Sequence, residues 1–448
     1  MSYFTLFDFT ILLDTLYIVF YVFMWITMLY LYQRERKTFD AGSFLLSAYS
    51  IYALSSLFLY YDSYYGEDFH NLSIFPFIYL FFMLYLTAKP VLNYNTRKID
   101  GIECPNMLIL NVVSVIFIIS SLLALPSIFQ GLAKGLALMM VDESHVQELY
   151  ADSADLADSA GHGINNLRSI ISGALTEFGI MLVFYYFTLE QKSKYLRYIA
   201  YGLLCSVFVC TFGTISLGQR GLMIETFLLI LATYFLFKNV LPTKLNKAIR
   251  IIGVIFASFV FSLFVLMTVN RFSNNGDREV MSTVYYYAGE ENLIFNKYAF
   301  NNNGIRYGDR TFPLFKKLLG FPNVPNNYIE RREKYNELKV NDEVFITHIG
   351  DFLLDFGPIL GTILILVISS KIIELSKVHD RKVKFHQLIL IHATLYLCVI
   401  GGLKLYPFSD VGGNLKLIVY AVLYMTFRID YDMRIVNKRK RINNTNEK

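Results

Sequence analysis

The feature that most constrains this chain is a repeated run of apolar residues long enough to cross a lipid bilayer. The first run is "TILLDTLYIVFYVFMWITMLYLY", residues 10–32, and similar runs recur along the whole chain. A helix needs about 17–25 mostly apolar residues to cross the hydrocarbon core, where each backbone polar group must bond within its own segment. With 55% hydrophobic and only 17% charged residues, the composition excludes an ordinary soluble domain.

The apolar runs predict an all-α polytopic membrane protein with about eleven transmembrane helices, within a range of roughly ten to twelve. The first run is itself long enough to span, so we expect no short cleavable signal peptide. The predicted spans are residues 10–31, 42–60, 75–94, 107–130, 170–188, 196–217, 222–238, 249–270, 350–370, 387–403 and 413–428.

The lysine and arginine residues of the short loops predict the orientation of the chain. The short loops on one side of the membrane hold almost no cations, and "YYDSYYGEDFHN" holds none. Cytoplasmic loops carry an excess of Lys and Arg, so we expect the N-terminus outside and the C-terminus in the cytoplasm. The basic loops are residues 33–37, 89–98, 192–197, 238–250 and 371–384, followed by the tail "NKRKRINNTNEK".

Two external loops are long. Residues 131–169 are acidic, and their apolar spacing predicts a short amphipathic helix on the membrane surface. Residues 271–345, between spans eight and nine, carry eleven Lys or Arg, ten Asp or Glu and fourteen Phe or Tyr. This loop is too aromatic for a disordered linker, and a folded loop on a rigid bundle is where a site is expected.

These features divide the chain into six segments. The external loops 131–169 and 271–345 separate three groups of spans, and a basic cytoplasmic tail follows that we expect to contact anionic lipid. The span-containing segments are 1–130 with spans one to four, 170–270 with spans five to eight and 346–428 with spans nine to eleven, and the tail is 429–448.

The motifs that are missing from the sequence exclude several classes of function. The four cysteines have neither zinc nor disulfide spacing and read as small core residues. The chain has no Walker loop, no dinucleotide-binding glycine pattern and no zinc signature. We therefore expect no metal, no cofactor, no chemistry on ATP or a nucleotide-sugar, and no nucleic-acid partner.

Arginines at the outer ends of spans need an explanation, because the positive-inside rule disfavours them there. Arg220 lies between spans six and seven, Arg271 ends span eight, and Arg278 follows it. A guanidinium group is suited to forked recognition of phosphate oxygens, so together they predict a diphosphate-binding site. The alternative is that Arg220 reaches lipid headgroups or pairs with Glu225.

The stretch "MSTVYYYAGEENLIFNKYAFNNNGIRYGDRTFPLFKKLLG", residues 281–320, has the composition of a carbohydrate-binding surface. Aromatic faces stack on the C–H side of a sugar, and amides and charged groups bond its hydroxyls. We expect Tyr286, Tyr287, Arg306 and Arg310 to contact sugar. The alternative is a small loop domain whose aromatic residues form its own core.

The segment "THIGDFLLDFGPILG" opens span nine with ionisable residues. If it is helical, His348, Asp351 and Asp355 share one face, because their spacings are three and four. His348 or Asp355 could act as a general base and Asp351 could contact sugar. The alternative is that the aspartates are counter-ions of the external arginines. Asp14 and Glu177, in apolar runs, line the same cavity or satisfy neighbouring helices.

Three stretches resemble a known family. "SLGQRGLMIETF", "YYYAGEENLIFNKY" and "THIGDFLLDFGPILG" are similar to segments of the bacterial oligosaccharide repeat unit polymerases, the Wzy-type O-antigen and capsule polymerases. The number of spans and the sizes of the loops also resemble that family over nearly the whole chain. His348, however, is not a residue expected throughout the family.

The resemblance implies a membrane-embedded glycosyltransferase of the lipid-phosphate-sugar type in the bacterial inner membrane. It implies an undecaprenyl-diphosphate-linked oligosaccharide as donor, a second lipid-linked repeat unit as acceptor, no metal, and a chain-length regulator as a further partner. The arginines would hold the diphosphate as it leaves. His348 or an acid such as Glu290 would take the proton of the acceptor hydroxyl.

Three other functions remain open from the sequence. An O-antigen ligase uses the same chemistry with another acceptor. A lipid-linked oligosaccharide flippase would show internal repeats and charged residues in mid-span. A membrane O-acyltransferase would need a histidine within its spans, and His392 is the candidate for it.

Overall fold

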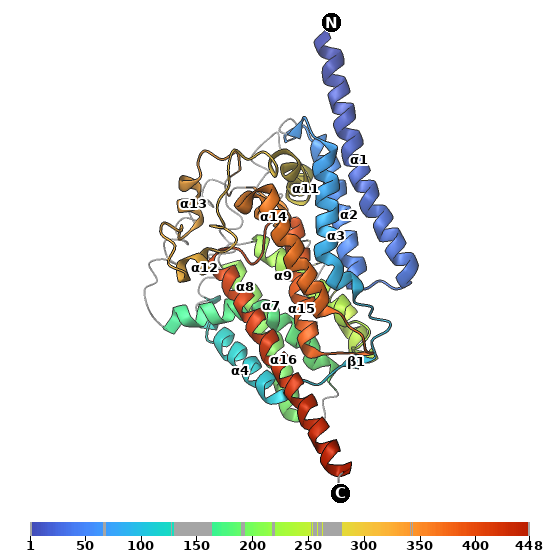
Figure 1. Ribbon diagram of the computed structural model, residues 1–448, viewed down its shortest axis with the longest axis vertical. Helices are drawn as coiled ribbons and strands as arrows, with labels where there is room; N and C mark the ends of the chain where they lie inside the picture. The colour runs from blue at the N-terminus through green and yellow to red at the C-terminus, as the bar shows by residue number, and fades with distance from the viewer. Residues whose placement is uncertain are drawn as a thin grey trace.

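Helices dominate the fold, and most of them run roughly along the long axis of the molecule (Figure 1). The computed structural model describes residues 2–65, 69–126, 128–129, 164–189, 193–216, 220–251, 253, 258, 262, 280–340, 342 and 344–446. The predicted surface helix in 131–169 lies outside these residues except for its end, 164–169, where a long helix begins. Most of the eighth predicted span, 249–270, also lies outside them.

The regular elements of the described residues are the following. The helices are α1 Ser2–Arg36, α2 Ala41–Tyr60, α3 Ile74–Asn93, α4 Met107–Leu122, α7 Ile164–Thr188, α8 Lys194–Ser216, α9 Arg220–Phe237, α11 Val280–Tyr298, α12 Pro313–Leu318, α13 Tyr328–Lys334, α14 Thr347–Ser376, α15 Phe385–Leu403 and α16 Asp410–Asn446. The strands are β1 Gly101–Ile102 and β2 Lys382–Val383.

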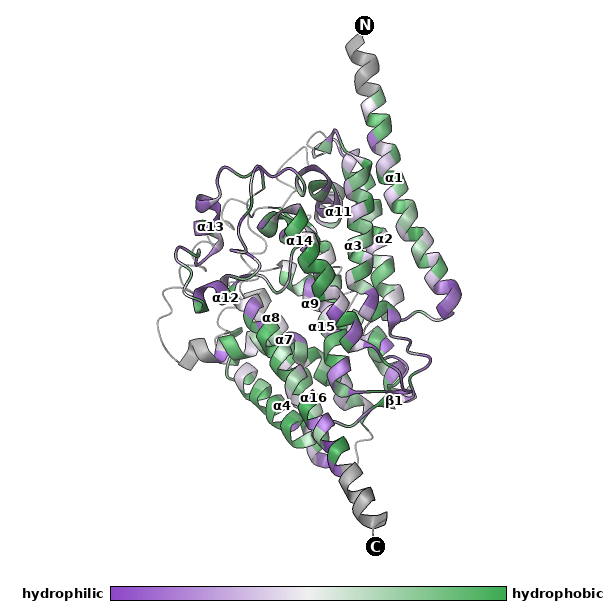
Figure 2. Cartoon of the chain, in the orientation of Figure 1, coloured by the Kyte–Doolittle hydropathy of each residue, from purple (hydrophilic) through white to green (hydrophobic). Residues whose placement is uncertain are grey.

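Seven of the described helices are long and apolar enough to cross a membrane: parts or all of α1, α2, α3, α7, α8, α14 and α15. The apolar helices α4 and α9 are shorter, and α16 contains the last predicted span. The chain is therefore a mostly helical protein with multiple helices of membrane-spanning length. Figure 2 shows these helices largely in green, the colour of hydrophobic residues. Purple, the colour of hydrophilic residues, is concentrated around α12, α13 and β1.

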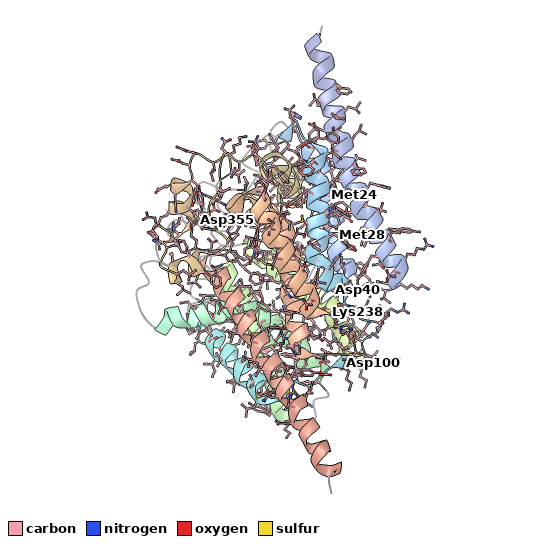
Figure 3. The ribbon with its side chains drawn as sticks, viewed as in Figure 1. Met24, Met28, Asp40, Asp100, Lys238 and Asp355 are labelled. Carbon is pink, nitrogen blue, oxygen red and sulfur yellow. The ribbon has the colours of Figure 1, made fainter. Side chains whose placement is uncertain are left out.

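Four of the loops that the sequence marks as basic, 33–37, 89–98, 238–250 and 371–384, lie at one end of the bundle, here called the β1 end (Figure 3). The parallel pair of β1 and β2 joins two of them, with Gly101 opposite Lys382. Lys238 Nζ donates to Phe39 O at 3.2 Å and joins two others. Figure 3 places Asp40, Asp100 and Lys238 together in this region and Asp355 far from them.

The remaining described loops meet at the opposite end, here called the α13 end. Asp14 of α1 accepts the backbone N–H groups of Asn71 and Leu72 at 2.8 and 2.9 Å, and so fixes the loop between α2 and α3. The backbone N–H of Thr347 donates to Lys404 O at 2.8 Å and joins the start of α14 to the end of α15. The basic loops and the other described loops thus lie at opposite ends of the bundle.

Helix α14 breaks sharply near its tenth residue. Gly357 has φ 77° and ψ 164°, and Pro358 follows it. A Cβ at Gly361 would lie 2.7 Å from Phe352 O, whereas nine residues of straight helix span about 13 Å. The chain therefore folds back at the break. The first segment, residues 347–356, is almost entirely buried, and exposed apolar residues begin at Ile359.

The large loop 271–345 contains a buried helix, α11, that packs directly on α2. A Cβ at Gly289 would lie 2.5 Å from the backbone N of Ser56, so only glycine allows this approach. Ser56 Oγ donates to Gly289 O at 2.8 Å. This contact fixes the position of the next residue, Glu290, which belongs to the candidate site.

Candidate active site

Two of the predicted sugar-binding residues lie inside the protein. Arg306 and Arg310 are 1% and 5% exposed, and both face the first segment of α14. Arg306 Nη2 lies 2.9 Å from Asp351 Oδ1, and its Nε lies 2.6 Å from Asp355 Oδ1. Arg310 Nε lies 3.2 Å from Asp351 Oδ1. Asp351 and Asp355 are therefore counter-ions of two arginines of the large loop.

A third aspartate and a third arginine complete this arrangement. Asp342 pairs with Arg310, and its Oδ2 lies 2.6 Å from Nη2 of Arg331. We call the six residues the arginine–aspartate network: Arg306, Arg310, Arg331, Asp342, Asp351 and Asp355. Three positive and three negative groups balance, as burial of charge requires. The network fastens the large loop to α14, and we propose no ligand contact for Arg306, Arg310 or Asp351.

Asp355 has several donors besides its ion pair with Arg306. Besides Arg306, its carboxylate accepts the backbone N–H groups of Arg310 and Thr311 at 3.2 and 2.7 Å. It also accepts the hydroxyl of Thr311 at 2.8 Å. A carboxylate held by one guanidinium and three further donors is poorly placed to take a proton from substrate. We therefore do not carry Asp355 forward as a catalytic residue.

His348 lies on the same buried segment of α14 but contacts a different part of the bundle. It is 2% exposed, and its Nε2 lies 3.2 Å from Thr87 Oγ1 of α3. A Cβ at Gly401 of α15 would lie 3.0 Å from the His348 ring. The imidazole is thus enclosed by α3 and α15, and a substrate hydroxyl has no room beside it. We propose no catalytic role for His348.

A separate group of charged residues gathers at the α13 end of α7, α9, α15 and α16. Lys404 Nζ, just past α15, lies 2.6 Å from Glu225 Oε1 of α9. Lys416 Nζ of α16 lies 2.6 Å from Glu177 Oε1 of α7. Tyr396 lies close to both carboxylates and joins the two pairs. All four charged side chains are 12–24% exposed, so unlike the network they are open to a ligand.

Glu290 on α11 is a buried acid that reaches this group through Phe345. It is 2% exposed, and its carboxyl accepts the hydroxyl of Tyr286 at 2.9 Å and the backbone N–H of Phe345. Burial raises the pKa of Glu290 to about 8, although the bonds from Tyr286 and Phe345 oppose the shift. Such a carboxyl changes charge near neutral pH, as a catalytic acid or base does.

Phe345 connects Glu290 with the charged pairs. Lys404 Nζ lies over its ring, 5.2 Å from the centroid, and the ring of Tyr287 lies 6.2 Å from it. Tyr286 stacks on Tyr65 of the loop between α2 and α3, with centroids 4.4 Å apart. We call Glu177, Glu225, Glu290, Lys404 and Lys416, with Tyr286, Tyr287, Phe345 and Tyr396, the charged cluster. The predicted residues Glu290, Tyr286 and Tyr287 all belong to it.

The predicted diphosphate-binding arginines are only partly within the described structure. Arg220 is the first residue of α9, which places its backbone beside the cluster: a Cβ at the next residue, Gly221, would lie 2.8 Å from Lys404 Nζ. The side chain of Arg220, and all of Arg271 and Arg278, lie outside the described residues. Glu225, the alternative partner of Arg220, is bonded to Lys404.

Sequence reasoning overlooked Lys404 and Lys416. The same rule that drew attention to the arginines also applies to lysines, since Lys404 lies in a short loop on the sparsely charged side. A single cation in a short loop beside span ten changes the charge of that loop too little to stand out. The partners of these lysines, on helices distant in sequence, give no signal in one sequence.

Two other residues noted in the sequence have structural surroundings. Both ring nitrogens of His392 form hydrogen bonds, one with Thr233 Oγ1 and one with Tyr420 Oη, each at 3.0 Å. His392 is therefore not available as the catalytic histidine that a membrane O-acyltransferase would need. The carboxylate of Asp14 accepts backbone N–H groups of the loop between α2 and α3. Within the described residues, no three His, Cys, Asp or Glu side chains are grouped as a metal site requires.

Comparison of the chain with protein-family models, with curated proteins and with solved structures found no match.

Proposed function

We propose that this protein is a membrane glycosyltransferase that polymerises oligosaccharide repeat units linked to undecaprenyl diphosphate, as the sequence resemblance implies. In this proposal the chain spans a bacterial inner membrane about eleven times, with the α13 end outside. The observation that carries the proposal is the charged cluster. It combines cations, a buried acid of raised pKa and aromatic rings where apolar helices end.

The cluster has groups suited to each part of the transfer. A hydroxyl of the acceptor sugar attacks the anomeric carbon of the lipid-linked donor, and a new C–O bond forms. The bond from that carbon to the phosphate oxygen breaks, and the lipid diphosphate leaves with the electron pair. Arg220, with Lys404 beside it, stabilises the leaving diphosphate. Glu290, once ionised, takes the proton of the attacking hydroxyl.

A flippase is the main alternative from another class. Transport requires polar groups along a path through the middle of the bundle. Apart from the pair of Glu177 and Lys416, which joins α7 to α16, the described charged pairs lie toward the two ends. Buried His392 is bonded to its neighbours. This distribution favours an enzyme that works at one membrane face.

The direct test is polymerisation by membrane vesicles supplied with lipid-diphosphate-linked repeat units. We expect Arg220→Ala and Arg278→Ala to abolish long chains while single repeats persist and the protein still inserts normally. Lys371→Gln, which removes one partner of an exposed pair in α14, is the control and should leave chain length unchanged. Wild-type chain lengths in both arginine variants would contradict a diphosphate-binding role.

A second acceptor separates the polymerase from the related ligase. The same vesicles are given lipid-linked oligosaccharide together with a lipid core acceptor. A polymerase lengthens the lipid-linked glycan, whereas a ligase transfers it to the core. Transfer to the core without lengthening would overturn the polymerase proposal and leave the chemistry of the cluster in place.

A further inference from the structure

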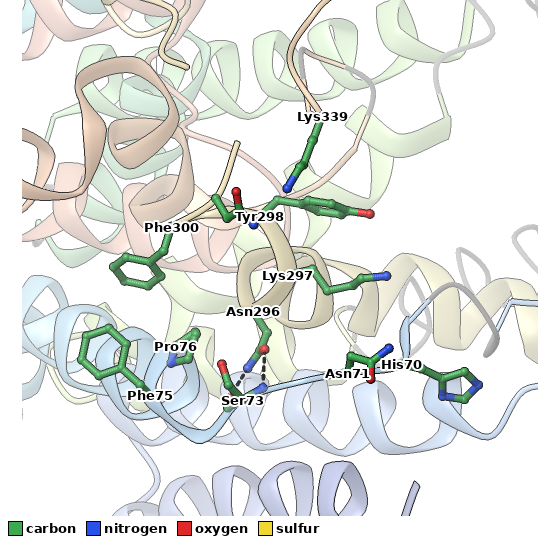
Figure 4. A pocket seen from close by; sticks show the side chains of 11 residues that line it. His70, Asn71, Ser73, Phe75, Pro76, Asn296, Lys297, Tyr298, Phe300 and Lys339 are labelled. Atoms are coloured by element: carbon green, nitrogen blue, oxygen red, sulfur yellow. Dashed lines mark hydrogen bonds between the residues drawn. The ribbon is translucent and has the colours of Figure 1, made fainter. Parts of the chain in front are cut away.

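A cavity of about 530 Å³ lies beside the C-terminal end of α11, apart from the charged cluster. Its walls come from the loop before α3, the start of α3, the end of α11 and the segment at Lys339. Figure 4 shows Phe75 and Phe300 at one end of the cavity, with Lys297 and His70 extending toward the other. Nothing in the chemistry of the transfer described above uses these residues.

The walls of the cavity are held in place by hydrogen bonds. The amide of Asn296 accepts the backbone N–H of Ser73 at 3.0 Å and donates to Ser73 O at 2.7 Å. On the other side, Asn302 bonds both backbone groups of Val340, at 2.6 and 2.9 Å, and so fixes the chain next to Lys339. A ligand would therefore meet a site that is largely formed in advance.

The cavity combines aromatic surface with ammonium groups. Phe75 is 60% exposed, and its ring lies 5.2 Å from that of Phe300, which gives an apolar face of the kind on which a sugar ring packs. Lys297 and Lys339 line the cavity from α11 and from the loop segment. The lining residues that the structure describes include no Asp or Glu. This combination matches a saccharide that bears an anionic group.

The geometry of α11 relates this cavity to the charged cluster. Tyr286, Glu290 and Lys297 are spaced by four and seven residues, so they lie along one face of the helix. Seven residues of helix place Lys297 about 10 Å from Glu290 along the axis. The segment 339–345 runs between the same two places, since Lys339 lines the cavity and Phe345 bonds Glu290.

We propose that this cavity binds an acidic sugar unit, one bearing a carboxylate or a phosphate, of the same glycan whose reacting end lies at the charged cluster. The inference rests on the proposed function and adds the substrate class: the repeat unit is anionic. The ring of the sugar packs on Phe75 and Phe300, and its anionic group lies between Lys297 and Lys339.

The test measures binding separately from transfer. The full-length protein in nanodiscs is titrated with a soluble tetrasaccharide of galacturonic acid and with a neutral galactose tetrasaccharide of the same length. We expect the acidic probe to bind at least about tenfold more tightly, as one charge-assisted bond provides. Lys297→Gln combined with Lys339→Gln should remove the difference, whereas Lys317→Gln, outside the cavity, should keep it. Added salt should weaken the binding of the acidic probe alone.

Each result decides the proposal. Equal affinities for the two probes, or no binding of either, would overturn it. Displacement of the acidic probe by phosphatidylglycerol would also overturn it, because the cavity would then be a lipid headgroup site.

Polymerisation is measured on the same variants. A protein that prefers the acidic probe but never transfers sugar would contradict the proposed function alone, and one that polymerises without the preference would contradict the acidic site alone.

Discussion

At the scale of single residues, the surroundings of an ionisable group decide whether it can do chemistry. Asp355 and Glu290 are both buried acids at the α13 end. Asp355 faces a guanidinium group and three other donors, and these contacts occupy its carboxylate. Glu290 receives one hydroxyl and one backbone N–H, and burial raises its pKa to about 8. Glu290 is therefore the acid that we propose for proton transfer.

Glu290→Gln is therefore the sharpest single-residue test. We expect transfer to slow by roughly 10²- to 10⁴-fold, the usual contribution of a general base. In the wild type the rate should rise with pH through about 8, as Glu290 ionises, and this rise should be lost in the variant. The matched control is Glu291→Gln, because Glu291 is equally buried but bonds Asn292. Equal rates for Glu290→Gln and the wild type would rule out a proton-transfer role.

The same pKa shift predicts how stability depends on pH. A carboxyl whose pKa rises from 4.5 to about 8 on folding contributes stability that is fully present below about pH 4.5 and is lost as the pH rises toward 8. Glu290→Gln, which stays neutral, should flatten the fall in melting temperature across this window. The comparison needs no substrate, so it also shows whether the variant is folded.

At the scale of elements, the sequence predicted helices well and the contacts between them poorly. The apolar run predicted a helix over 350–370, and α14, Thr347–Ser376, contains it, because hydrophobic periodicity is a local property. Their partners were not predictable: the aspartates face Arg306 and Arg310, whereas His348 faces Thr87. Those partners depend on how the large loop folds over α14, and on a break at Gly357 that reorients the segment.

The arginine–aspartate network makes the attachment of the large loop sensitive to a single change. Asp355→Asn leaves Arg306 with one buried partner fewer, and breaking a buried pair costs about 3–5 kcal/mol. We expect a lower melting temperature in detergent and faster proteolysis within residues 299–346. Glu374→Gln removes one partner of an exposed pair in the same helix, both side chains at least 67% exposed, and should leave the melting temperature almost unchanged because water screens such a pair. If both variants had similarly small effects, the network would not be what holds the large loop on α14.

At the scale of the whole molecule, the separation of two ends is what makes a one-sided enzyme plausible. The charged cluster, the arginine–aspartate network and the cavity beside α11 lie at the α13 end, whereas the basic loops meet at the β1 end. A lipid-linked substrate whose diphosphate lies at a membrane surface can reach groups only at that surface. The proposed function therefore requires the α13 end to face outside, as the positive-inside rule predicts.

Cysteine labelling on right-side-out membrane vesicles tests this requirement. Glu337→Cys and Asp380→Cys introduce exposed thiols at the α13 and β1 ends, in a chain whose exposed Cys104 and Cys205 are replaced by serine. An impermeant maleimide should label Glu337→Cys directly and Asp380→Cys only after the membrane is opened. The reverse pattern would place the charged cluster in the cytoplasm, where an external lipid-linked donor could not reach it. Labelling of both sites in sealed vesicles would mean that the two ends do not lie on opposite sides of a bilayer, and the spans would then need to be reassigned.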